Sequence, residues 1–177
     1  MRELPWRPPG RLSRSPRLEV HASFRYVFPL PEFIGRAKLG GDYGLAQQLG
    51  TLMATRMPVA AADIDLVCPV PLPYLRSVRR GYNQALEMAR PIAAALSVPL
   101  VGSALVRHGQ QMQRGLNREQ RQRNVAQSFT ADACVRGQRV LVIDDVTTTG
   151  ASLREAARAL RAAGATQVIA WAAAAVD

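Results

Sequence analysis

The chain has 177 residues, of which 48% are hydrophobic, and its formal net charge is +10. This length suits one domain with a small appendage. No apolar run approaches the roughly 20 residues of a membrane-spanning helix, and the first residues lack the apolar centre of a secretory signal. We therefore expect a cytoplasmic protein without membrane insertion.

Arginine supplies nearly all of the positive charge, because Lys38 is the sole lysine. Such a charge favours anionic partners, either phosphate-rich small molecules or nucleic acid. The two cysteines, Cys68 and Cys134, each lie in an apolar setting with no second cysteine or histidine at metal-ligand spacing. We therefore expect two small buried residues rather than disulfide or zinc chemistry.

The first 20 residues contain four prolines and five arginines, a composition typical of an extended or disordered tail ahead of a domain over residues 21–177. Short apolar or alternating runs predict strands over residues 21–29, 65–73 (until its prolines turn it into a loop), 125–130, 140–143 and 166–174. Apolar residues at helical spacing predict helices over residues 31–38, 43–57, 83–96 and 151–163. Strands that alternate with helices predict an α/β fold, with a central, mostly parallel sheet flanked by helices on both faces.

The most informative stretch begins with residues 140–143, an apolar run that suits a buried parallel strand. Asp144 and Asp145 would then lie at its carboxyl end, where open α/β sheets bind their ligands. Residues 147–150 form a turn before a helix, and the N–H groups of a helix N-terminus beside threonine hydroxyls bind phosphate. Two acids next to a phosphate loop predict a phosphorylated ribose as the ligand. The alternative is an ordinary strand–turn–helix with solvated acids.

Two further segments offer cations to an anion. The proline-rich loop at residues 69–72 is followed by Arg76, Arg79 and Arg80, which can present backbone N–H groups and guanidinium groups to an anion. Residues 107–124 form the most polar part of the chain and are rich in arginine and glutamine. Each segment has a plainer alternative, a solvated basic loop for the first and an amphipathic helix with solvated arginines for the second.

The stretch from residue 140 to 153 resembles the signature of type I phosphoribosyltransferases, which bind phosphoribosyl pyrophosphate (PRPP). Pro-Val-Pro-Leu at 69–72, Arg-Gly-Tyr-Asn-Gln-Ala at 80–85 and the segment 113–125 resemble one branch closely. That branch is the ComF family, linked to DNA uptake in naturally competent bacteria. The resemblance runs from about residue 22 to 177 and implies the type I phosphoribosyltransferase fold.

The resemblance also implies a site in which the acid pair holds the ribose hydroxyls and Mg²⁺ binds through PRPP, with no metal bound directly by the protein. A mobile loop would close over PRPP and exclude water. The candidate catalytic residues are Asp144, Asp145, Arg118 and Arg121. The residues expected around the 5-phosphate are Val146, Thr147, Thr148, Thr149, Gly150, Ala151 and Ser152. Those expected around the pyrophosphate are Pro69, Val70, Pro71, Leu72, Arg80, Asn83 and Gln84.

ComF proteins usually begin with a zinc-binding region of paired cysteines near a Leu-Pro-Trp. This chain has Leu-Pro-Trp at residues 4–6 but not those cysteines, so zinc is not expected. Either the zinc-binding region has been lost from this protein, or the start of the sequence has been trimmed.

Two functions follow as hypotheses. The first is an enzyme that transfers phosphoribose to a nitrogen acceptor. The second is a non-catalytic module that binds nucleotides, single-stranded DNA or competence proteins on the same fold. Aromatic residues are 6% of the chain, which is few for the stacking platforms that bind single strands.

Overall fold

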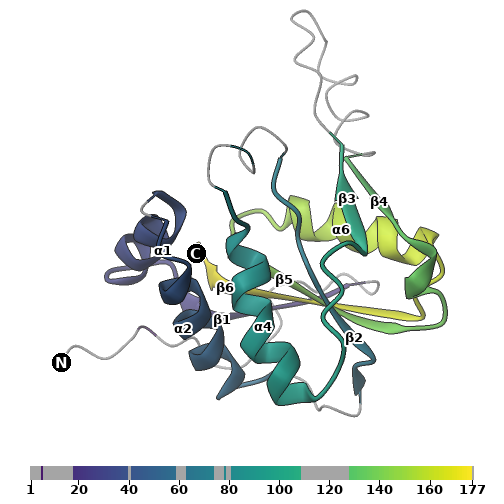
Figure 1. The fold of residues 1–177 in the computed structure, drawn as a ribbon, viewed down its shortest axis with the longest axis horizontal. Coiled ribbons are helices and arrows are strands. Elements are labelled where there is room, and N and C mark those ends of the chain that lie inside the picture. The colour runs from purple at the N-terminus through teal and green to yellow at the C-terminus, as the bar shows by residue number, and fades with distance from the viewer. Residues whose placement is uncertain are drawn as a thin grey trace, which may run out of the picture.

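A computed structural model describes Pro5 and residues 18–39, 41–58, 63–73, 78, 81–108 and 128–176. Its main sheet has four parallel strands in the order β1 (Glu19–Arg25), β6 (Gln167–Ala175), β5 (Arg139–Thr147) and β2 (Leu66–Pro69) (Figure 1). A second, antiparallel sheet pairs β3 (Leu105–Arg107) with β4 (Phe129–Ala131). The predicted α/β class with a mostly parallel sheet is confirmed.

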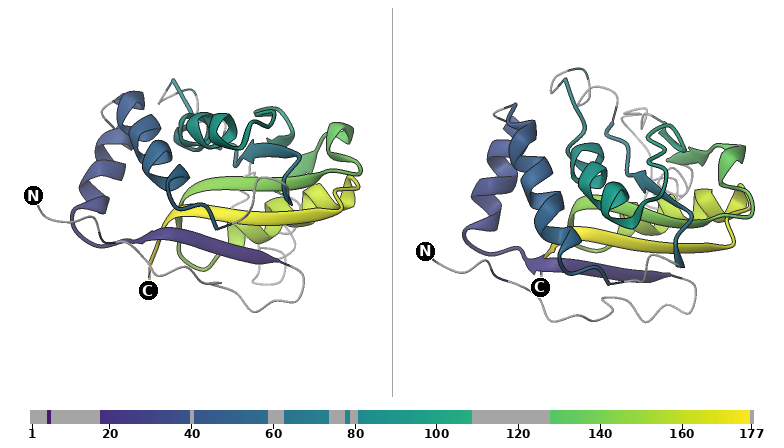
Figure 2. Two further views of the ribbon diagram at one scale, coloured as in Figure 1. Left: turned by 90° about the horizontal axis from the view of Figure 1, so that it is seen from below. Right: turned by 60° about the horizontal axis from the view of Figure 1, so that its bottom comes forward.

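Helices cover both faces of the main sheet, as Figure 2 shows from two further directions. One face packs against α1 (Leu30–Leu39), α2 (Tyr43–Ala54) and α4 (Gln84–Leu96), and the core there includes Leu141 and Trp171. The other face packs against α6 (Ala151–Ala162) and the small sheet, and its core includes Val140 and Val142. Successive residues of β5 thus enter opposite cores, as the two-residue period of a strand requires.

The strands differ from the predicted bounds where their neighbours decide their length. β1 begins at Glu19, two residues inside the predicted tail, and ends at Arg25 opposite Ala175, the last residue of β6. The predicted strand ran on to residue 29, but Phe28 is 57% exposed. β5 continues past the predicted end at residue 143 through Thr147, because β6 offers a partner up to Ala175.

Other corrections have local causes. Helix α2 ends at Ala54 rather than at residue 57, and Pro58 disfavours helical geometry at the residue before it. A short 3₁₀ turn, η2 (Ala133–Val135), precedes β5, and Cys134 lies exposed in it rather than buried. Cys68 is buried as expected, and burial raises the pKa of its thiol to about 12. The antiparallel β3–β4 pairing was not predicted.

Candidate active site

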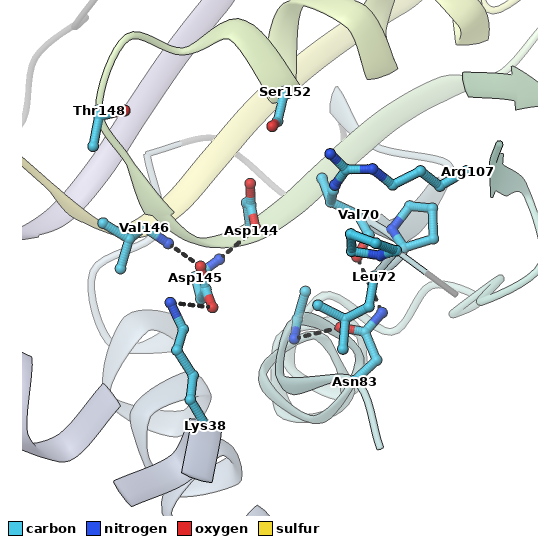
Figure 3. A pocket seen from close by; sticks show the side chains of 13 residues that line it. Lys38, Val70, Leu72, Asn83, Arg107, Asp144, Asp145, Val146, Thr148 and Ser152 are labelled. Carbon is cyan, nitrogen blue, oxygen red and sulfur yellow. Dashed lines mark hydrogen bonds and ion pairs between the residues drawn. The ribbon is translucent and has the colours of Figure 1, made fainter. Parts of the chain in front are cut away.

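The site lies where the chain of β2 leaves the sheet. The last residue of β2, Pro69, pairs with Ile143, so that beyond this point β5 continues with β6 on one side only. The chain after β2 turns away across the open side of β5, and a cavity of about 300 Å³ forms there (Figure 3). It is lined by Lys38, Val70, Pro71, Leu72, Pro73, Asn83, Ala85, Arg107, Asp144, Asp145, Val146, Thr148 and Ser152.

The acid pair lies inside β5 and not beyond its end, and this placement sends the two side chains to opposite faces of the sheet. Figure 3 shows Asp144 directed toward Ser152 of α6 and Asp145 directed toward Lys38 of α1. Both acids still line the cavity, because no β2 neighbour covers this part of β5. The structure therefore brings the predicted acids together at one cavity, each with different surroundings.

Asp145 has three hydrogen-bonding or ionic partners among the residues that the structure describes. One carboxylate oxygen accepts the backbone N–H of Val146 at 2.6 Å. The other lies 2.8 Å from the Lys38 ammonium and accepts the Gln84 side-chain N–H at 3.2 Å. Lys38 and Asp145 are mostly buried, with 26% and 16% of their side chains exposed, so this ion pair is screened less than a surface pair.

Asp144 is less well compensated. Its carboxylate accepts the backbone N–H of Asp145 at 2.8 Å, and this is the one side-chain hydrogen bond it makes within the described part of the chain. Burial, and then the charge of Asp145, raise its pKa to about 7. The hydrogen bond and the charges of Lys38 and Arg107 oppose this rise. An acid whose pKa lies near neutrality in a cavity is a feature of functional sites.

The predicted phosphate loop divides into residues that reach the cavity and residues that do not. Val146, Thr148 and Ser152 line it, whereas Thr147 is only 6% exposed as the last residue of β5. Thr149 and Ala151 are exposed, and the Thr149 hydroxyl accepts the Ala151 N–H at a long 3.4 Å.

Helix α6 begins at Ala151, and its N-cap residue, Gly150, provides no side-chain cap hydrogen bond. The glycine has φ +72°, a conformation that other residues rarely adopt. A Cβ atom there would lie 3.0 Å from an Arg154 guanidinium nitrogen. The start of α6 is thus an uncapped, positive helix end beside an arginine, which favours an anion.

The predicted pyrophosphate loop also divides. Val70, Pro71 and Leu72 line the cavity, but Pro69 is buried inside β2 and does not.

Two of the three polar residues predicted around the pyrophosphate, Asn83 and Gln84, act within the fold. Asn83 lines the cavity and caps α4, since its side-chain oxygen accepts the Ala85 N–H and its amide donates to the Val70 carbonyl, both at 3.0 Å. Gln84 is 2% exposed and contacts Asp145 instead of the loop. The other predicted cations, Arg76, Arg79, Arg80, Arg118 and Arg121, lie outside the described residues.

Two cations in the cavity were missed by the sequence analysis. Lys38 comes from the last turn of α1, and Arg107 from β3, where its guanidinium lies 5.1 Å from the Phe129 ring centroid. The one sequence signal for Lys38 is that it is the single lysine in a chain whose other basic side chains are mainly arginine. The one signal for Arg107 is that it is the first residue of the polar segment 107–124. Neither signal indicates an approach to the acid pair.

Among the described residues, no three His, Cys, Asp or Glu side chains come together as a possible metal site. None of the helices in these parts of the chain is long and apolar enough to cross a membrane.

Comparisons with known proteins agree with this geometry. Residues 45–176 match the phosphoribosyl transferase domain family. Competence protein F of Haemophilus influenzae is 31% identical over 156 residues, which are 82% of this chain and 68% of that protein. DNA utilization protein YhgH of Escherichia coli K12 is 30% identical over 152 residues, 82% of this chain and 67% of that protein.

A solved structure shows the same fold. The glutamine phosphoribosylpyrophosphate amidotransferase from B. subtilis, complexed with ADP and GMP, matches with a TM-score of 0.53 and 24% identity over 72% of this chain and 25% of that chain. The chain belongs to the family of phosphoribosyl transferase domains. Within that class it is a member of the ComF family, as the sequence resemblance implied.

Proposed function

We propose that the cavity binds PRPP or a related ribose phosphate with Mg²⁺, and that the protein transfers phosphoribose to a nitrogen acceptor. The observation that carries this proposal is one cavity that joins the acid pair of β5 to the uncapped start of α6. Carboxylates accept hydrogen bonds from ribose hydroxyls, and the helix end binds the 5-phosphate. Thr148 and Ser152 add hydroxyl groups on the same side.

Mg²⁺ fits the charges of this cavity. PRPP carries several negative charges, and next to two carboxylates its binding would be unfavourable without cations. Lys38 and Arg107 supply two positive charges at the cavity. The ion would be held by the oxygens of PRPP and would add positive charge at the diphosphate.

The reaction that the site supports is a substitution at C1 of the ribose. The C1–O bond to pyrophosphate breaks and the oxygen keeps the electron pair, while the acceptor nitrogen forms a bond to C1 and loses its proton to water. The chain contributes charge and position: Arg107 and the backbone N–H of Leu72 would face the departing pyrophosphate, and the acid pair would position the ribose. Of the other residues in the 70–73 loop, Val70 donates its N–H to the Ile143 carbonyl, and the two prolines have none. Catalysis in this form needs no nucleophilic side chain.

Calorimetry tests the binding step. We expect Mg·PRPP and ribose 5-phosphate to bind, and the S152A/T148V double variant to weaken both by roughly tenfold or more, because hydrogen bonds to a charged group are lost. T51V is the matched control, since Thr51 is an exposed threonine on α2 whose hydroxyl bonds the Gln47 carbonyl. Absence of binding at millimolar PRPP would overturn the proposal. Release of pyrophosphate on addition of nitrogenous bases tests the transfer step.

A second function is favoured by a different observation. The chain has a net charge of +10, and its relatives are a competence protein and DNA utilization proteins by name. We infer single-stranded DNA as a candidate partner of this basic chain. Its affinity for a labelled oligonucleotide should fall steeply with salt, because phosphate contacts release counterions. A flat plot of log K against log[salt] would exclude it.

A further inference from the structure

The acids of the cavity lie on different faces of β5, and only one of these faces carries the start of α6. Asp144 is directed toward Ser152, whereas Asp145 is directed away from α6 toward Lys38 (Figure 3). A ligand whose phosphate is held by Thr148 and Ser152 therefore meets Asp144 on its own side of the sheet. Asp145 reaches the cavity from the other side.

The contacts of the two acids differ in the same sense. Asp145 is engaged by Val146, Lys38 and Gln84, so both of its oxygens already have partners. Asp144 makes one side-chain hydrogen bond within the described residues, through one oxygen, and has its second oxygen available. A ribose hydroxyl thus finds an open acceptor on Asp144 but must displace a partner at Asp145.

The group around Asp145 joins three elements. Lys38 comes from the last turn of α1 and Gln84 from the first turn of α4, and both contact the same carboxylate oxygen on β5. The Gln84 amide oxygen is buried and has no hydrogen-bond partner in the described chain, a costly arrangement that follows from turning the amide N–H to Asp145. Such contacts hold Asp145 in one place.

We propose that the acids have different tasks: Asp144 contacts the ribose hydroxyls, and Asp145 works from the other face by holding Lys38 and Gln84, which makes Lys38 a positioning residue of the site. This rests on the proposed ribose-phosphate function and divides a role that the sequence resemblance assigns to both acids. Lys38 and Asp145 together fix the distance of α1 from β5 beside the cavity.

The test compares two probes, inorganic phosphate and ribose 5-phosphate, by calorimetry. The dissociation constant of inorganic phosphate divided by that of ribose 5-phosphate isolates the contribution of the ribose. A change in the electrostatic potential of the cavity acts on both phosphate groups and therefore largely cancels in this ratio. We expect D144N to reduce this ratio roughly tenfold or more, because a hydrogen bond to a carboxylate is lost. D145N and K38M should each change it less than about threefold. An equal reduction of this ratio in D144N and D145N would overturn the proposal that the two acids have different tasks.

A ligand-free measurement tests the role of Lys38 separately. A double-mutant cycle of K38M and D145N on the unfolding equilibrium constant in urea should show a coupling of roughly threefold or more. R36M is the matched control, because Arg36 lies on the same helix, is 67% exposed, and pairs with Asp42 rather than with Asp145. The R36M and D145N cycle should show no coupling, and circular dichroism melts confirm that each variant folds.

The outcomes separate the two proposals. If the wild-type chain binds neither PRPP nor ribose 5-phosphate, the proposed function fails and the task of Asp144 fails with it. The cycle still decides whether Lys38 acts through Asp145. If ribose 5-phosphate binds but K38M and D145N show no coupling, Lys38 is not a positioning residue and this inference fails while the proposed function stands.

Discussion

Two helices begin at the cavity, and they begin differently. Helix α4 follows Asn83, whose side chain accepts the Ala85 N–H and donates to the Val70 carbonyl, so the chain itself caps this helix end. Helix α6 follows Gly150, which provides no side-chain cap, and the Thr149 hydroxyl accepts a single long hydrogen bond from the Ala151 N–H. The N–H groups at the start of α6 are thus the ones left for a ligand.

The acids repeat this contrast. On the side of α4 and α1, Asp145 is bound by Lys38 and Gln84. On the side of α6, Asp144 has one hydrogen bond and a pKa raised by burial to about 7. The closed side builds the walls of the cavity, and the open side keeps polar groups available for the proposed phosphorylated sugar. A binding site lies where the fold leaves its own polar groups without partners.

The largest effect is expected from closing the open side. T149D places a carboxylate at the start of α6, where it takes the free N–H groups and repels the phosphate of a ligand. We expect ribose 5-phosphate affinity to fall roughly a hundredfold, while the free energy of unfolding rises by about 0.5–1 kcal/mol. Calorimetry and urea denaturation measure the two changes. T149N is the control, because it can cap the helix without adding a charge. Unchanged affinity for ribose 5-phosphate in T149D would contradict the view that the start of α6 binds the phosphate.

An intermediate effect is expected from pH and Asp144. The pKa of Asp144 in the folded chain, about 7, lies above its usual 3.8. Between pH 4 and 7 the folded chain therefore binds more protons than the unfolded chain, and stability falls as pH rises through this window. D144N should raise the free energy of unfolding by about 2 kcal/mol at pH 8 and leave it nearly unchanged at pH 4. Urea denaturation at both pH values decides, and equal effects of D144N at the two values would show that the pKa of Asp144 is not raised by its surroundings.

The same titration predicts the pH dependence of binding. Ionised Asp144 can accept a ribose hydroxyl through the oxygen that the Asp145 N–H leaves open, so affinity for ribose 5-phosphate should increase as pH rises through about 7. The phosphate group has a pH dependence of its own, which parallel titrations with inorganic phosphate measure. In D144N we expect ribose 5-phosphate to show this dependence and no more.

The smallest effect is expected on the closed side. N83A removes the cap of α4 and the bond to Val70 and should cost about 1 kcal/mol of unfolding free energy. N83S keeps a capping oxygen but is too short to reach the Val70 carbonyl, so it should recover part of the loss. A cost in N83S equal to that in N83A would show that the bond to the loop, rather than the cap, stabilises this side.

Local order along the chain was predictable because it depends on neighbours in sequence. The apolar run, the acid pair, the hydroxyl-rich turn and the helix after Gly150 follow one another within 14 residues, and the structure places them as strand, loop and helix. Periodicity also predicted α4 with Asn83 at its start. Such patterns act through hydrogen bonds and side chains a few residues apart, so they can be read without knowing the tertiary structure.

Tertiary structure alone decided which side chains contact the acid pair. Lys38 and Gln84 reach Asp145 from 107 and 61 positions earlier in the chain, and no local pattern indicates that approach. The extension of β5 through Thr147 depends on the length of β6, and with it the opposite directions of Asp144 and Asp145. These features depend on how helices pack on the two faces of the sheet. The sequence by itself therefore determined the order of buried strand, acid pair, hydroxyl-rich turn and helix, and packing determined which acid is open and which is held.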